Sequence, residues 1–129
     1  MNILDTPIDS SQCRGINLTG YPDKYLDELG FETFNFDIDK SDKFEIQVLE
    51  ILTEIIDDFR RIYVVLPHFR PCITYVVTAI RELTGQPPIV VYFKPKPNGD
   101  YIPHYVDMRS YQSLCRQARR KLRQKVLDK

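Results

Sequence analysis

The sequence predicts an α/β fold built as one domain, residues 1–129, with a mostly parallel sheet, helices on both faces and one antiparallel edge strand. Short apolar runs the length of buried strands alternate with longer stretches in which apolar residues recur at helical spacing. The 129 residues are enough for one hydrophobic core. Asn98-Gly99, between the last two strand-like runs, is typical of a hairpin turn and therefore predicts the antiparallel strand.

The first third of the chain is expected to hold two strands and a short helix. Residues 1–12 lack periodicity and form either a loose arm or a short strand at 2–4. Residues 14–18 form the first strand of the sheet, and residues 22–29 form a helix between a proline and a glycine. Apolar and polar residues alternate over 31–38, which predicts a half-buried strand. Its buried face carries Phe34, Phe36 and Ile38.

The middle of the chain predicts a helix, a buried strand and a second helix. Asp42 and Glu45 form a capping box that begins a helix with an apolar stripe reaching Phe59. Residues 62–66 are a continuous apolar run, which is typical of a central parallel strand. Pro71 then begins an amphipathic helix that ends at Thr84, before Gly85.

The last third predicts a hairpin followed by a long helix. Residues 89–93 form a buried strand, and residues 101–106 return beside it as an edge strand, because Pro103 and His104 interrupt the run. Residues 108–129 make a basic C-terminal segment that is helical to residue 127. Five of its side chains are expected to face the core: Tyr111, Cys115, Ala118, Leu122 and Val126.

The net charge of zero conceals a division between the two halves of the chain. Up to Phe59 there are fourteen Asp/Glu and four Lys/Arg, and from Arg60 onward there are fourteen Lys/Arg and four Asp/Glu. Such a division indicates either a face that attracts an anionic partner or two halves that neutralise each other within one fold.

Several classes of protein are disfavoured by the sequence. No apolar stretch is long enough to span a bilayer, and the first residues do not resemble a signal peptide, so a cytoplasmic protein is expected. The three cysteines are far apart, which predicts neither a disulfide framework nor a metal site. No phosphate-binding or dinucleotide-binding glycine motif occurs, and no cofactor is predicted.

The predicted strand order places a ligand site between two loops. The strand 31–38 is expected at one edge, followed by 14–18, 62–66 and 89–93. In this order the sheet grows in opposite directions on either side of the pair 14–18 and 62–66, and ligands bind at such a switch point. The helices after these two strands have Tyr21 and Arg70 at their cap positions, which leaves main-chain N–H groups for a ligand or for water. The candidate ligand-binding residues are Asn17, Thr19, Gly20, Tyr21, Pro67, His68, Phe69 and Arg70.

These side chains suit a nucleotide ligand. Arg70 could hold a phosphate, and His68 could donate to a phosphate, stack on a base or act as a general base. Phe69 or Tyr21 could stack on a base. Each residue also has an ordinary structural interpretation. Arg70 could form a surface ion pair, His68 could be an exposed loop residue, and Phe69 could pack over the strand end. Asn17 and Thr19 are common in turns.

Three segments resemble small accessory proteins of type III CRISPR loci. They are 63–71, Tyr-Val-Val-Leu-Pro-His-Phe-Arg-Pro; 84–90, Thr-Gly-Gln-Pro-Pro-Ile-Val; and the final basic helix. Those proteins have a compact Rossmann-like, three-layer fold similar to that of cyclic-oligoadenylate sensor domains. The resemblance implies that this chain binds a cyclic oligoadenylate, with cyclic tetra-adenylate as the first choice, and forms a homodimer or a higher homo-oligomer.

Four functions follow from these observations. The first is sequestration of the messenger, which lowers its free concentration. The second is a metal-independent ring nuclease, in which His68 and Arg70 would assist attack by a ribose 2′-hydroxyl. The third is binding of linear nucleic acid through the basic helix within 108–129. The fourth, binding of a mononucleotide cofactor, is ranked last because the chain has no phosphate loop.

Overall fold

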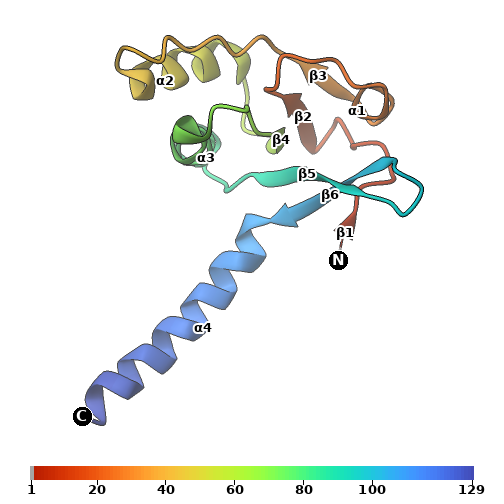
Figure 1. The fold of residues 1–129 in the computed structure, drawn as a ribbon. Coiled ribbons are helices and arrows are strands. Elements are labelled where there is room, and N and C mark those ends of the chain that lie inside the picture. Colours follow the sequence, from red (N-terminus) through yellow and green to blue (C-terminus); the bar gives the residue numbers. More distant parts are fainter. Residues whose placement is uncertain (1) are drawn as a thin grey trace.

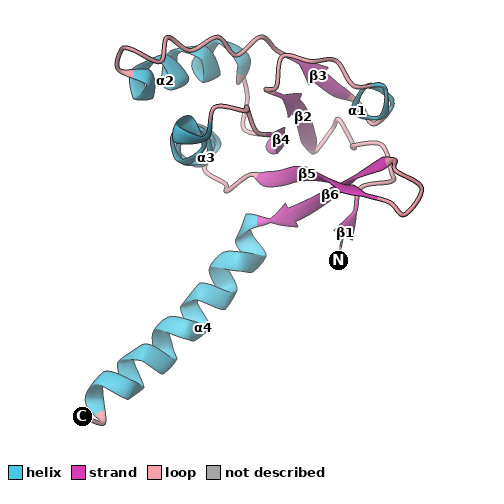
Figure 2. Ribbon diagram, in the orientation of Figure 1, coloured by secondary structure: helices cyan, strands magenta, loops and turns pink. Residues whose placement is uncertain are grey.

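The computed structural model describes residues 2–129, so Met1, the first residue of the predicted N-terminal arm, lies outside the described residues. The described chain forms a six-stranded sheet with the order β1-β6-β5-β4-β2-β3 (Figures 1 and 2). The strands are β1 (Asn2–Ile3), β2 (Cys13–Asn17), β3 (Phe31–Thr33), β4 (Arg61–Val65), β5 (Ile89–Pro95) and β6 (Tyr101–Asp107).

The predicted sheet is confirmed in its order and in its directions. The strands β3, β2, β4 and β5 are parallel neighbours, and β6 returns antiparallel to β5. The Asn98-Gly99 turn joins these last two strands, and Gly99 adopts a positive φ of 90° there. One detail of the prediction is wrong: β6 is not the edge. β1 pairs with it antiparallel, with Asn2 opposite Tyr105 and Ile3 opposite His104, and so forms the edge itself.

Two helices cover one face of the sheet. They are α2 (Phe44–Ile55) and α3 (Ile73–Thr84), which pack against each other. Together with β2 and β4 they enclose the larger core, which contains Ile16, Leu18, Val48, Leu52, Ile55, Ile62, Val64, Cys72, Val76, Ala79 and Ile80. These residues are those that the helical and strand periodicities assigned to the interior.

The opposite face carries a smaller core under α1 (Lys24–Glu28) and the N-terminal segment. Its buried residues are Leu4, Leu26, Leu29, Phe31, Val65 and Val91. Alternate residues of β4 therefore serve the two cores, with Val64 on the α2/α3 side and Val65 on the α1 side. Gly15 of β2 lies where there is no room for a side chain, because an added Cβ would come within 2.7 Å of Ile8 Cδ1.

The capping box predicted at Asp42 is not formed. The Asp42 carboxylate accepts from the N–H of the next residue, Lys43, at 2.7 Å and so does not reach the N–H groups further into α2. The amide of Gln47 instead bridges to the main chain of Asp39, with contacts of 2.7 and 3.1 Å. The helix also ends earlier than predicted, at Ile55, and Phe59 is 77% exposed rather than part of the buried stripe.

The strand predicted over 31–38 is also shorter than expected. β3 ends at Thr33, yet Phe34, Phe36 and Ile38 still pack against the larger core from an irregular segment. Their alternation was therefore a correct indication of burial, although hydrogen bonding to β2 is confined to the first residues.

The C-terminal helix α4 (Met108–Leu127) differs most from the prediction. It leaves the end of β6 and projects away from the sheet (Figure 1). In the described chain no residue of α4 is buried, so the side chains expected to face the core face solvent instead. Within residues 2–129, none of the helices has the length and apolar character needed to cross a membrane.

Candidate functional site

A pocket of about 400 Å³ lies at the carboxyl ends of β2, β4 and β5, where the switch point of the sheet was predicted. Its volume is within the range of small-molecule sites, which is roughly 300–1,000 Å³. The wall is mostly apolar and includes Pro22, Leu26, Val65, Leu66, Val90, Val91, Tyr92 and Phe93; the polar lining residues are Asn17, Thr19, Tyr21, Asp23 and His68.

The loop after β2 is organised by the buried side chain of Asn17. Its Nδ2 donates to the carbonyl of Tyr21 at 2.9 Å and to Thr33 Oγ1 at 3.2 Å. Its Oδ1 accepts from the N–H of Thr19 at 3.0 Å and from the Thr19 hydroxyl at 2.7 Å. The hydroxyl of Thr19 in turn accepts from the N–H of Tyr21 at 3.2 Å. Asn17 and Thr19 therefore hold the loop in shape, and their hydrogen-bonding groups are largely used within it.

The two predicted loops meet across the mouth of the pocket. The ring of Tyr21 lies 6.0 Å from the ring of His68, centre to centre, with an angle of 51° between the planes. Both residues are exposed, so each ring offers an edge or a face to a ligand. Within residues 2–129 the main-chain N–H groups of His68 and Phe69 donate no hydrogen bond, which leaves two donors beside the imidazole.

The remaining predicted residues do not line this pocket. Phe69 points toward the larger core, where its ring meets Phe44 edge-on at 5.4 Å and the ammonium of Lys40 lies 5.0 Å from its centre. The N–H and thiol of Cys72 both donate to the Phe69 carbonyl, at 3.2 and 3.0 Å, which fixes this orientation. Burial also raises the pKa of the Cys72 thiol, so it stays protonated at neutral pH.

Pro67, Gly20 and Arg70 surround the site rather than enter it. Pro67 is buried, and Gly20 provides the positive φ of 80° that turns the loop after Thr19. Arg70 is exposed and begins a 3₁₀ turn, Arg70–Cys72, that leads into α3. As predicted, no side chain caps the start of α3.

One capping prediction is wrong, and it changes the chemistry of the pocket. The helix α1 is not left uncapped, because Asp23 accepts the N–H of Leu26 at 3.1 Å through Oδ1. The predicted cap position, Tyr21, is two residues too early, because the helix begins at Lys24 and not at Pro22. A carboxylate therefore lies in the pocket wall, and its second oxygen remains available to a ligand.

The wall contributed by β5 was also missed by the sequence analysis. Tyr92 stacks on the buried ring of His104, with 5.8 Å between the ring centres, and the ammonium of Lys94 lies 5.8 Å from the centre of the Tyr92 ring. The available signal was topological: β5 neighbours β4, so its carboxyl end is also close to the switch point.

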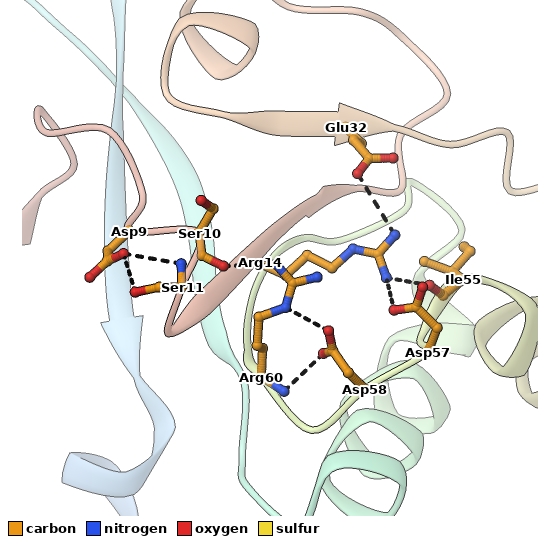
Figure 3. Close-up of polar contacts among 9 residues, drawn as sticks. All are labelled: Asp9, Ser10, Ser11, Arg14, Glu32, Ile55, Asp57, Asp58 and Arg60. Atoms are coloured by element: carbon orange, nitrogen blue, oxygen red, sulfur yellow. Dashed lines mark hydrogen bonds and ion pairs between the residues drawn. The ribbon is translucent and has the colours of Figure 1, made fainter.

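A second polar cluster, drawn in Figure 3, has a structural role. Arg14, which is partly buried near the start of β2, donates a hydrogen bond to the Ile55 carbonyl and pairs with Asp57 and Glu32 at 3.4 and 3.8 Å. Arg60, which precedes β4, pairs with Asp58 at 2.7 Å and donates to the Ser10 carbonyl at 2.8 Å. A hydrogen bond from the Arg60 main chain is the main cause that lowers the pKa of Asp58. These contacts tie loops together at the amino ends of the parallel strands, away from the pocket.

Comparison of the chain with protein-family models, with curated proteins and with solved structures found no match. In residues 2–129, His, Cys, Asp and Glu side chains form no group of three suited to a metal ion.

Proposed function

We propose that the chain binds a cyclic oligoadenylate through this pocket, with cyclic tetra-adenylate as the first candidate, and lowers the free concentration of this messenger. The observation that carries the proposal is the meeting of Tyr21 and His68 over a mostly apolar pocket at the switch point of the sheet. The resemblance of the sequence to accessory proteins of type III CRISPR loci supplies the class of ligand.

The pocket offers a different group to each part of an adenylate unit. The apolar wall formed by Leu26, Val65 and Phe93 suits the flat face of an adenine, with Tyr21 as the stacking partner at the mouth. The free oxygen of Asp23 can accept a hydrogen bond from a ribose hydroxyl or from the exocyclic amine of the base. One nucleotide unit suits the pocket, and the rest of a ring would lie over its rim.

The phosphates of the ring would lie at that rim, outside the carboxylate of Asp23. His68 lines the pocket on this side, and the unbonded N–H groups of His68 and Phe69 come just before the 3₁₀ turn that leads into α3. The imidazole of His68 adds a donor, and the exposed guanidinium of Arg70 adds a positive charge on the same loop.

Sequestration is favoured over cleavage because the pocket has few groups for acid–base chemistry. Its titratable side chains are His68, Tyr21, Tyr92 and Asp23, and the Asp23 carboxylate already caps α1. A ring nuclease remains the alternative, with His68 as the base and Arg70 as the cation that stabilises the transition state.

The test is incubation of the protein with labelled cyclic tri-, tetra- and hexa-adenylate without metal, followed by native gels and chromatography. We expect an intact ring that migrates with the protein. Linear products that disappear in a His68→Ala variant would establish the nuclease instead. No shift with any ring would overturn the proposal.

Two pairs of variants make this test specific to the pocket. Tyr21→Ala should weaken ring binding at least tenfold, whereas Tyr25→Ala, which removes another exposed tyrosine four residues later, should have no effect. Arg70→Ala should weaken binding and reduce its salt dependence, whereas Arg81→Ala in the last turn of α3 serves as its control. Equal effects of both members of a pair would remove that residue from the site.

A further inference from the structure

The helix α4 carries an apolar stripe that the fold leaves uncovered. Tyr111, Leu114, Leu122 and Val126 are each 55–59% exposed, and together with Ala118 they lie on one side of the helix. In the described chain, β6 is the principal element that α4 contacts, and these contacts are at its first turn. A continuous stripe of this kind on an exposed helix indicates a binding surface.

Positive charge borders this stripe. The helix holds seven Lys/Arg and no Asp/Glu. Helical spacing places Lys121 and Lys125 along one border of the stripe and Arg119 and Arg123 along the other. The partner of α4 should therefore present a narrow apolar stripe bordered by carboxylates.

The helix α2 presents such a surface on the same chain. Its buried side carries Val48, Leu52 and Ile55, and its outer side exposes Ile46 and Leu49, at 51% and 47%. The helix holds three acidic residues and no basic one, and helical spacing places Glu50 and Glu54 on one border of the Ile46–Leu49 pair and Glu45 on the other. The exposed apolar pair and acidic borders of α2 are therefore complementary in charge and hydrophobicity to the apolar stripe and basic borders of α4.

The two helices of one molecule are far apart. Figure 1 shows α4 leaving the end of β6 and running away from the body of the fold, while α2 lies beyond α3 on the far side of β5. The acidic and basic helices thus do not neutralise each other within one copy. A second copy is required to bring them together.

We propose that two copies of this chain pair through reciprocal contacts, in which α4 of each copy lies along α2 of the other. A two-fold axis would make both contacts at once and close the assembly. At 1.5 Å per residue, the 20 residues of α4 span about 30 Å and the 12 residues of α2 about 18 Å, so α2 can cover more than half of the stripe.

Other partners explain fewer of these features. A linear nucleic acid would neutralise the Lys/Arg borders but would leave Tyr111, Leu122 and Val126 in water. An anionic membrane surface could bury the α4 stripe but would leave Ile46 and Leu49 of α2 uncovered, with acidic borders that it repels. Direct α4–α4 pairing would bring two helices with seven positive charges each into contact.

Charge reversal provides a test that does not depend on the proposed ligand. The first variant reverses one border of the α4 stripe (Lys121→Glu, Lys125→Glu), and the second reverses one border of the exposed α2 pair (Glu50→Lys, Glu54→Lys). All four positions are exposed, so both variants should fold, which circular dichroism would verify. A Lys24→Glu, Asp27→Lys variant on the exposed side of α1 is the control. The mass of each protein, and of an equimolar mixture of the first two, is measured by sedimentation equilibrium in low salt.

We expect the original chain and the control to have twice the monomer mass of 15.2 kDa, and each reversed variant to be a monomer. The mixture should regain the dimer, because the two changed borders then face each other with opposite charges and the other contact is that of the original chain. An α2-reversed variant that stays dimeric would overturn the proposal and indicate α4–α4 pairing. A monomeric original chain would also overturn it, and gel shifts with linear RNA or binding to anionic vesicles would then identify the partner of α4. Ring binding by monomeric variants would leave the proposed function intact.

Discussion

The pair formed by Arg61 and Asp107 should contribute strongly to stability, because it fixes the start of α4 to the sheet. The Asp107 carboxylate receives two hydrogen bonds from the Arg61 guanidinium, of which the Nη1–Oδ2 contact is 3.1 Å. It also accepts the N–H of Arg109 at 2.9 Å and so caps α4. The two side chains are 11% and 27% exposed, so the pair is partly buried and is screened less by solvent than a surface ion pair.

Two substitutions at Asp107 separate these roles. Asparagine is as good a cap as aspartate, so Asp107→Asn should mainly remove the charge pairing, at a cost of about 2–3 kcal/mol. Asp107→Ala also removes the cap, which adds about 1 kcal/mol. Arg61 has little opportunity to find another partner, since its Nε is buried without one in the described chain. For a chain of this length, each kcal/mol corresponds to roughly 3–4 °C in the melting temperature.

The assay is urea unfolding followed by circular dichroism, at one protein concentration because pairing would make stability concentration-dependent. Asp27→Asn, at an exposed position of α1, is the control and should change the free energy of unfolding by less than about 0.5 kcal/mol. An Asp107→Asn variant as stable as the original chain at pH 7 would refute the reasoning.

The same pair predicts a dependence on pH. The hydrogen bonds from Arg61 are the largest cause that lowers the pKa of Asp107 below its ordinary value. A carboxylate with a lowered pKa in the folded state stabilises the fold above its unfolded pKa, about 3.9, and loses this contribution as the pH falls through the folded pKa. The free energy of unfolding of the original chain should therefore exceed that of Asp107→Asn by the full amount at pH 7, and this difference should shrink steadily below about pH 4.

Three further predictions concern packing and the pocket loop. Gly15→Ala should destabilise the fold by about 1–3 kcal/mol in thermal unfolding, because its Cβ would come within 2.7 Å of Ile8 and 2.9 Å of Phe31. Leu52→Ala should cost about 2–5 kcal/mol in urea unfolding, since Leu52 is fully buried in the larger core. Asn17→Ala should cost about 2–4 kcal/mol and also weaken ring binding in the native-gel assay, because four hydrogen bonds of the pocket loop are lost. Unchanged binding by Asn17→Ala would show that loop order is not needed.

The strand order was predictable because few alternatives satisfy the rules for alternating strands and helices. The apolar run at β4 identified a central strand, and the Asn98-Gly99 turn specified the hairpin. Right-handed crossovers reduce the possible arrangements, and the observed order places α2 and α3 on one face of the sheet and α1 on the other. Edge assignment depends on weaker signals: the short run at residues 2–4 does not specify a partner strand, so the pairing of β1 with β6 does not follow from the sequence.

Helix starts were predicted less well than helix faces. A proline or an acidic residue near a boundary is compatible with several cap positions, and the choice depends on a local geometry that the sequence does not specify. Asp23, directly after Pro22, caps α1, whereas the Asp42 carboxylate accepts a hydrogen bond from the N–H of the next residue, Lys43. Likewise, helical periodicity correctly found one apolar side of α4, but the prediction that this side faces the core was wrong because the helix projects away from the sheet.

The division of the predicted site between pocket and core follows from the geometry of the loop after β4. Three consecutive residues have different surroundings: Pro67 is buried, His68 faces the pocket and Phe69 faces the larger core. The sequence places all three near the carboxyl end of the strand, but the turn that sends Phe69 toward Phe44 depends on its contacts with Cys72.

The bonding within the pocket indicates how a ligand would be selected. The polar groups of Asn17 and Thr19 are hydrogen-bonded within their own loop, so these residues shape the pocket and have little capacity left to bind a ligand directly. If the proposed function is correct, discrimination between ligands would come from the ring of Tyr21, the imidazole of His68 and the free oxygen of Asp23. In the proposed complex the Asp23 carboxylate would repel phosphate inside the pocket. A bound nucleotide would then have its base inward and its phosphates toward the rim, where a cyclic oligonucleotide would continue beyond the molecule.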